Sequence, residues 1–142
     1  VKTLNPGTAS GRLAGGCIEL LADSIGTLEQ PDFTSCIVLL EDVGEKAYQV
    51  DRQLVQMIRA RLFDGAAGIV VGTVTDWDKD ETTTPPINLQ DIWRNNLGPL
   101  GIPTILDFPF GHEPYPMTLP LGCVATLNAN TGSLALNESA VR

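Results

Sequence analysis

The chain has 142 residues, of which 43% are apolar and 18% charged, and this balance predicts one folded domain with its own hydrophobic core. The formal net charge is −8 with only nine Lys and Arg residues, which argues against nucleic acid as a partner, because clustered basic side chains bind its phosphates. No apolar stretch approaches the roughly 18 residues that cross a bilayer, so the sequence predicts no membrane-spanning segment.

Helices and strands alternate in the predicted structure of the first half. Apolar residues at helical spacing predict a short helix over 17–26. Residues 35–41 are typical of a strand that is buried on both faces. A longer amphipathic helix is expected over 50–62, with Asp51 as a candidate N-cap.

The second half continues this alternation and ends differently. We expect a buried strand over 68–71, a loop over 76–86, a helix over 88–97 that Asn88 caps, and a strand over 103–108. Turn residues between two apolar alternations predict an antiparallel hairpin over 124–136. The predicted fold class is therefore α/β, with a mixed sheet of short parallel strands plus a hairpin, and about three helices.

The only histidine, His112, lies in a segment (110–122) that is rich in Gly and Pro. This composition excludes a helix or central strand and predicts a shaped loop. An imidazole held in place suits general acid/base chemistry, because histidine changes its charge near neutral pH. A surface histidine without a role is the alternative interpretation.

Two adjacent carboxylates, Glu41 and Asp42, lie at the end of the buried strand 35–41. A carboxylate at the end of a strand can orient an imidazole. Neighbouring residues on a strand point to opposite faces, so only one of the two can face His112.

Six segments in chain order carry a resemblance to a known family. They are Gly11-Arg12-Leu13-Ala14-Gly15-Gly16-Cys17, Leu40 to Arg52, Gly68-Ile69-Val70-Val71-Gly72, Gly101-Ile102-Pro103, Phe110-Gly111-His112 and Leu119-Pro120-Leu121-Gly122. Together they resemble the C-terminal domain of the LD-carboxypeptidase family of serine peptidases, which includes muramoyltetrapeptide carboxypeptidases and microcin C immunity peptidases. Cys17 departs from the pattern, because many members have an Asn after the paired glycines.

The resemblance implies a mixed β/β/α domain of the swivelling type and a Ser-Glu-His triad. Glu41 matches the triad carboxylate, which the register of the motif favours over Asp42, and His112 matches the general base. The family's serine lies on a tight turn of a separate N-terminal domain, and no serine of this chain lies in a G-x-S-x-G arrangement. The chain also begins at Val1 without an initiator Met, so we expect one half of a longer enzyme, inactive alone.

The implied function is to supply Glu and His to a serine LD-carboxypeptidase that releases terminal D-alanine from muropeptide tetrapeptides in cytoplasmic cell-wall recycling. The alternatives are an antibiotic-cleaving peptidase of the microcin type and a non-catalytic binding or assembly module. Glu45 and Arg52 are candidates for substrate binding, with a structural role at the start of a helix as the alternative. Family members commonly dimerise, which makes a homodimer a candidate assembly.

No cofactor or metal is expected, because His112-Glu113 lacks the second histidine of an H-E-x-x-H motif. The three cysteines, Cys17, Cys36 and Cys123, have apolar neighbours in the sequence and form no C-x-x-C pair. We expect buried, reduced thiols, which fits a reducing cytoplasm.

Overall fold

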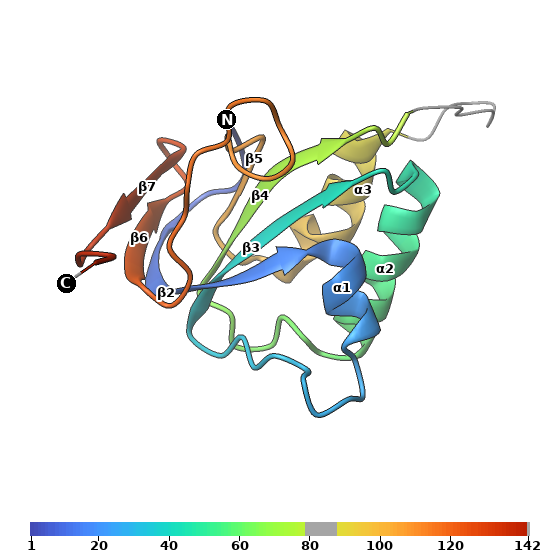
Figure 1. Ribbon diagram of the computed structural model, residues 1–142, viewed down its shortest axis with the longest axis horizontal. Coiled ribbons are helices and arrows are strands. Elements are labelled where there is room, and N and C mark those ends of the chain that lie inside the picture. The colour runs from blue at the N-terminus through green and yellow to red at the C-terminus, as the bar shows by residue number, and fades with distance from the viewer. Residues whose placement is uncertain (79–87, 142) are drawn as a thin grey trace.

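The computed structural model describes residues 1–78 and 88–141 (Figure 1). Its elements, in chain order, are β1 (Lys2–Asn5), β2 (Thr8–Cys17), α1 (Ile18–Asp23), β3 (Cys36–Val43), α2 (Ala47–Arg59), β4 (Gly68–Thr75), α3 (Leu89–Asn96), the 3-10 helix η1 (Gly98–Leu100), β5 (Thr104–Leu106), β6 (Val124–Asn128) and β7 (Ser133–Leu136).

The seven strands form one sheet in the order β1-β5-β4-β3-β2-β6-β7. Strands β2 to β5 are parallel to their neighbours within this group, whereas β1, β6 and β7 pair antiparallel. The predicted α/β class, with a mixed sheet, a hairpin and three α-helices, is confirmed.

The first two strands were not predicted. Strand β2 contains three glycines, which weaken the strand signal of its sequence. The sheet requires two of them. A Cβ at Gly11 would overlap the backbone of Ser35, the residue before strand β3, and a Cβ at Gly15 would overlap the backbone of Leu39 in β3. Glycine lowers the strand propensity of this segment, but here it is needed because the backbone of β3 lies too close for a side chain.

Several predicted boundaries are wrong. Helix α1 ends at Asp23, and β5 is shorter than the predicted strand 103–108. Helix α2 begins at Ala47, where Gln49 Oε1 accepts a hydrogen bond from the Lys46 N–H at 3.0 Å. Asp51 therefore lies within α2 and is not its N-cap; its carboxylate instead accepts a hydrogen bond from Asn96 at 2.7 Å.

The cap of the third helix is confirmed, since Asn88 Oδ1 accepts a hydrogen bond from the Gln90 N–H at 2.8 Å. Most of the predicted loop 76–86 lies outside the described residues.

Apolar residues cover both faces of the sheet. The three α-helices lie together on one face, where Val38 and Leu40 of β3 pack against them (Figure 1). Ile37 and Leu39 point to the other face and pack with residues of β6 and of the segment after β5. This alternation along β3 continues beyond Leu40 and decides where the two acidic residues at the end of the strand point.

Candidate active site

Glu41 and His112 come together at the carboxyl ends of the parallel strands. His112 Nδ1 lies 2.7 Å from Glu41 Oε2, in a hydrogen bond that the imidazole donates when Nδ1 carries the proton. The Glu41 side chain is only 11% exposed, whereas that of His112 is 56% exposed. The contact therefore engages Nδ1 and leaves Nε2 available for chemistry on the exposed side of the ring.

The backbone of the segment that carries His112 forms hydrogen bonds with strand β4. The Phe108 N–H donates to the Val71 carbonyl at 3.0 Å, and the Thr73 N–H donates to the Phe110 carbonyl at 2.9 Å. The segment therefore extends the sheet for a few residues before it reaches His112. These hydrogen bonds explain how a Gly- and Pro-rich loop holds an imidazole at a defined position.

Gly111 allows this segment to approach Glu41 closely. Its φ is 106°, a conformation that side chains other than glycine's disfavour. A Cβ at Gly111 would lie 2.9 Å from Glu41 Cβ and 3.2 Å from the Thr73 carbonyl oxygen. Glycine is therefore the residue that fits between Thr73 and the carboxylate that contacts the imidazole.

A cavity of about 320 Å³ adjoins the Glu41–His112 pair. Its walls are mostly small or apolar residues: Gly15, Gly16, Leu39, Phe110, Gly111, Leu119 and Leu121. Three segments that the sequence analysis singled out, namely the paired glycines, the end of the buried strand and the histidine loop, thus meet around one space. Apolar walls beside a few placed polar groups are typical of small-molecule sites.

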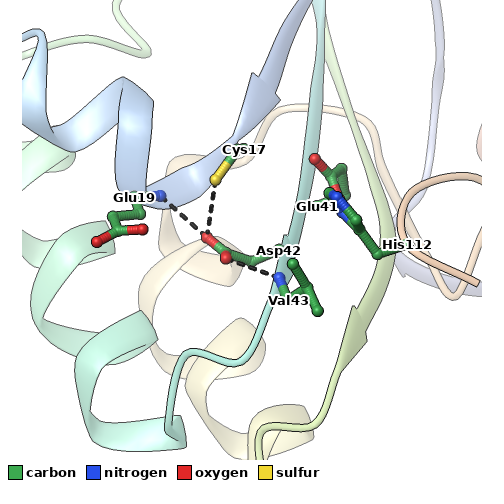
Figure 2. A network of polar contacts seen from close by, with 6 residues as sticks. All are labelled: Cys17, Glu19, Glu41, Asp42, Val43 and His112. Atoms are coloured by element: carbon green, nitrogen blue, oxygen red, sulfur yellow. Dashed lines mark hydrogen bonds and ion pairs between the residues drawn. The ribbon is translucent and has the colours of Figure 1, made fainter.

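Asp42 points to the opposite face of β3 and does not contact His112 (Figure 2). Asp42 is 1% exposed, and its Oδ2 accepts hydrogen bonds from the Glu19 N–H at 2.9 Å and from the Cys17 thiol at 3.5 Å. Its Oδ1 accepts the N–H of Val43 at 2.7 Å.

This carboxylate provides the cap that α1 lacks locally. Cys17, the residue before the helix, makes no side-chain cap hydrogen bond, so Asp42 of the neighbouring strand satisfies an N–H of the first turn. The sequence analysis missed this role, because it joins residues that are more than 20 positions apart in the sequence.

The three cysteines are free thiols, but the prediction that they are buried is wrong. Cys17 ends β2, Cys36 begins β3 and Cys123 precedes β6, so each lies at the end of a strand and is partly exposed. Partial burial raises the pKa of Cys17, and the nearby Asp42 carboxylate raises it further.

Glu45 and Arg52 do not line the cavity beside His112. Glu45 accepts a hydrogen bond from Gln53 Nε2 at 2.7 Å, and Arg52 is exposed on α2. Burial raises the pKa of Glu45, and the carboxylates of Glu19 and Asp42 add to this effect, while the Gln53 hydrogen bond opposes it. A substrate-binding role for Glu45 and Arg52 stays a prediction.

Within 1–78 and 88–141, no three His, Cys, Asp or Glu residues are grouped so that they could hold a metal ion. In the same part of the chain, the helices are too short or too polar to cross a membrane.

The chain is similar in sequence and structure to several known proteins. The chain is 40% identical over 139 residues to a Streptomyces coelicolor protein named as a carboxypeptidase. This alignment covers 97% of this chain and 43% of that protein. It is 28% identical over 123 residues to the murein tetrapeptide carboxypeptidase of Pseudomonas aeruginosa, covering 84% of this chain and 38% of that protein.

The crystal structure of muramoyltetrapeptide carboxypeptidase from Oxalobacter formigenes superimposes with a TM-score of 0.78 at 27% identity, over 96% of this chain and 47% of that one. The chain thus spans less than half the length of these proteins. A family model of the LD-carboxypeptidase C-terminal domain matches residues 10–127. Because this match extends over most of the sequence, the chain belongs to the LD-carboxypeptidase family and contains its C-terminal domain.

Proposed function

We propose that this chain supplies Glu41 and His112 to a serine LD-carboxypeptidase that releases the terminal D-alanine of muropeptide tetrapeptides during cell-wall recycling in the cytoplasm. The observation that carries the proposal is the 2.7 Å contact between Glu41 Oε2 and His112 Nδ1, beside a cavity of about 320 Å³. The carboxylate holds the ring by Nδ1 and leaves Nε2 as the base, which is the arrangement that nucleophilic catalysis by serine uses.

In the proposed reaction, a serine hydroxyl from an N-terminal domain transfers its proton to Nε2 of His112 while its oxygen attacks the carbonyl carbon of the terminal peptide bond. The tetrahedral intermediate then expels the amine of D-alanine, which receives that proton from His112. Water hydrolyses the resulting acyl-enzyme, again with His112 as the base. Glu41 orients the imidazole and stabilises its protonated form throughout.

The surface beside His112 suits contact with a second domain. Tyr115 is 93% exposed, Met117 50% and Leu121 61%, and all three lie on the loop that follows the histidine. Several exposed apolar side chains on one loop favour a surface that another domain covers. We propose that the nucleophile-bearing domain covers this loop and closes the cavity over the substrate.

A complementation experiment tests the proposal. The chain alone is expected to release no D-alanine from an L,D-tetrapeptide, and addition of a separately expressed N-terminal half restores release. In that mixture His112→Ala or Glu41→Gln lowers turnover on the order of 10⁴-fold, whereas Glu29→Gln, which alters an exposed carboxylate elsewhere, has no effect.

Two results would contradict this function. Near-normal turnover with His112→Ala would remove the acid/base role. Robust activity of the chain by itself would show that other residues perform the chemistry. Binding of the N-terminal half without any hydrolysis would instead favour the non-catalytic assembly module.

A further inference from the structure

Strand β2 extends beyond the strand that covers its outer edge (Figure 1). On one side, β3 pairs with β2 over residues 12–17. On the other side, β6 pairs with β2 over residues 8–12, and the Leu13 N–H then donates to the Cys123 carbonyl at 2.9 Å. Within the part of the chain that the structure describes, no strand pairs with this outer edge over residues 14–17.

This open stretch of β2 borders the cavity beside His112. Gly15 and Gly16 line that cavity, together with apolar residues of the histidine loop. Residues 14–17 are all partly exposed, so their backbone is accessible. A Cβ at Gly16 would meet no atom within 4 Å, which means that the space beside this glycine is open. A molecule in the cavity can therefore approach the backbone of β2 closely.

A strand with one uncovered edge can bind another extended backbone. Alternate residues of a strand direct their N–H and C=O groups to opposite edges, so part of the backbone over residues 14–17 faces away from β3. A peptide that adds to such an edge gains affinity from main-chain hydrogen bonds. The two glycines suit this mode of binding, because they place no side chain between the strand and the added backbone.

We propose that an extended peptide binds along this open edge of β2 and that its backbone forms hydrogen bonds with Gly15 and Gly16. This inference rests on the proposed function and adds how the substrate is held. Because Glu41 and His112 line the same cavity as the two glycines, a peptide bound there lies beside the imidazole. Recognition through the main chain selects an extended peptide, and the apolar walls of the cavity add contacts with its side chains.

An NMR titration of the ¹⁵N-labelled chain tests this binding. The probe is the L,D-tetrapeptide, which the chain alone is expected to leave intact. We expect the peptide to shift the amide signals of Gly15 and Gly16 saturably. Gly65 serves as an internal control, because it lies before β4 and outside the lining of the cavity, so its signal should stay unmoved.

Ester analogues of the probe distinguish strand pairing from simple occupation of the cavity. Replacing one peptide bond by an ester removes one N–H and hardly changes the size of the peptide. The N–H groups of consecutive residues point to opposite sides of an extended chain. We therefore expect one ester to weaken binding about fivefold, whereas the ester at the neighbouring bond, as the matched control, has little effect.

Glycine signals that the peptide leaves unmoved would overturn the proposal, and so would neighbouring ester analogues that bind equally well. Neither result depends on hydrolysis. If either occurs while the N-terminal half still restores D-alanine release, the proposed function stands and this mode of binding falls. Binding with the expected ester pattern, but without D-alanine release in the mixture, would support the peptide site and contradict the peptidase function.

Discussion

Replacing Gly111 by Ala tests whether the close approach of the histidine loop to Glu41 shapes the site. The new methyl group would meet Glu41 Cβ at 2.9 Å, Glu41 Oε2 at 3.1 Å and the Thr73 carbonyl oxygen at 3.2 Å. Overpacking of this kind costs about 1–3 kcal/mol. The φ of 106° adds backbone strain of about 1–3 kcal/mol for a residue other than glycine.

Two other glycines separate these contributions. Gly122 has a φ of 86°, but a Cβ there would meet no atom within 4 Å, so Gly122→Ala carries the backbone strain alone. Gly98 has neither a positive φ nor a neighbour within 4 Å, so Gly98→Ala should be neutral or slightly stabilising. We therefore expect the loss of stability to increase in the order Gly98→Ala, Gly122→Ala, Gly111→Ala, reaching about 2–6 kcal/mol for the last.

Urea unfolding followed by circular dichroism gives the three free energies of unfolding. Because the chain has one histidine, NMR of the imidazole reports separately on whether His112 still contacts Glu41. The Gly111→Ala chain should show a changed imidazole signal, and the other two should not. A Gly111→Ala chain that is no less stable than Gly122→Ala, with an unchanged imidazole signal, would refute the close fit described for this loop.

Three further predictions concern protonation. In long-range ¹H–¹⁵N spectra, the neutral ring of His112 should carry its proton on Nδ1, where Glu41 accepts it, and Glu41→Gln should give a mixture of the two tautomers. A predominant Nε2–H form in the unchanged chain would contradict the contact between Nδ1 and Glu41. Cys17 should react slowly with iodoacetamide at pH 8, because burial and the Asp42 carboxylate raise its pKa, and Asp42→Asn should speed the reaction; equal rates would exclude the carboxylate's influence. The raised pKa of Glu45 means that the folded chain binds more protons than the unfolded chain, so its stability falls as pH rises from about 4 through that pKa. Glu45→Gln should therefore stabilise the chain by up to about 0.5 kcal/mol at pH 7 but not at pH 3. Thermal unfolding at both pH values measures this difference.

The hydrophobic patterns predicted the central elements because each of them satisfies a local rule. Strands β3 and β4 are continuous apolar runs, and α2 and α3 carry an apolar stripe. Strand β2 follows no such rule. Two of its glycines are required because the backbone at and just before β3 lies close to them, and the sequence of β2 alone gives no sign of this. Local patterns therefore predict elements whose own side chains form the core, and they miss elements that a neighbour shapes.

The candidate site divides in the same way. The alternation of strand residues predicted that only one of Glu41 and Asp42 could face His112, and the contact belongs to Glu41. The role of Asp42 as a cap for α1 could not be predicted, because it depends on β2 and β3 lying side by side. Apolar neighbours in the sequence also misled the prediction for the cysteines, because position at the end of a strand, and not local hydropathy, sets their exposure.

The adjacent placement of Glu41 and Asp42 makes the site sensitive to the register of β3. A slip of one residue along this strand would exchange the two faces, so that Asp42 would point toward His112 and Glu41 toward α1. The aspartate is shorter by one methylene group, and the glutamate would enter a space shaped for the smaller carboxylate that now accepts the Glu19 N–H. The same pairing with β2 and β4 that fixes the sheet thus selects which acid reaches the imidazole, and a one-residue deletion within β3 would disable both the helix cap and the dyad.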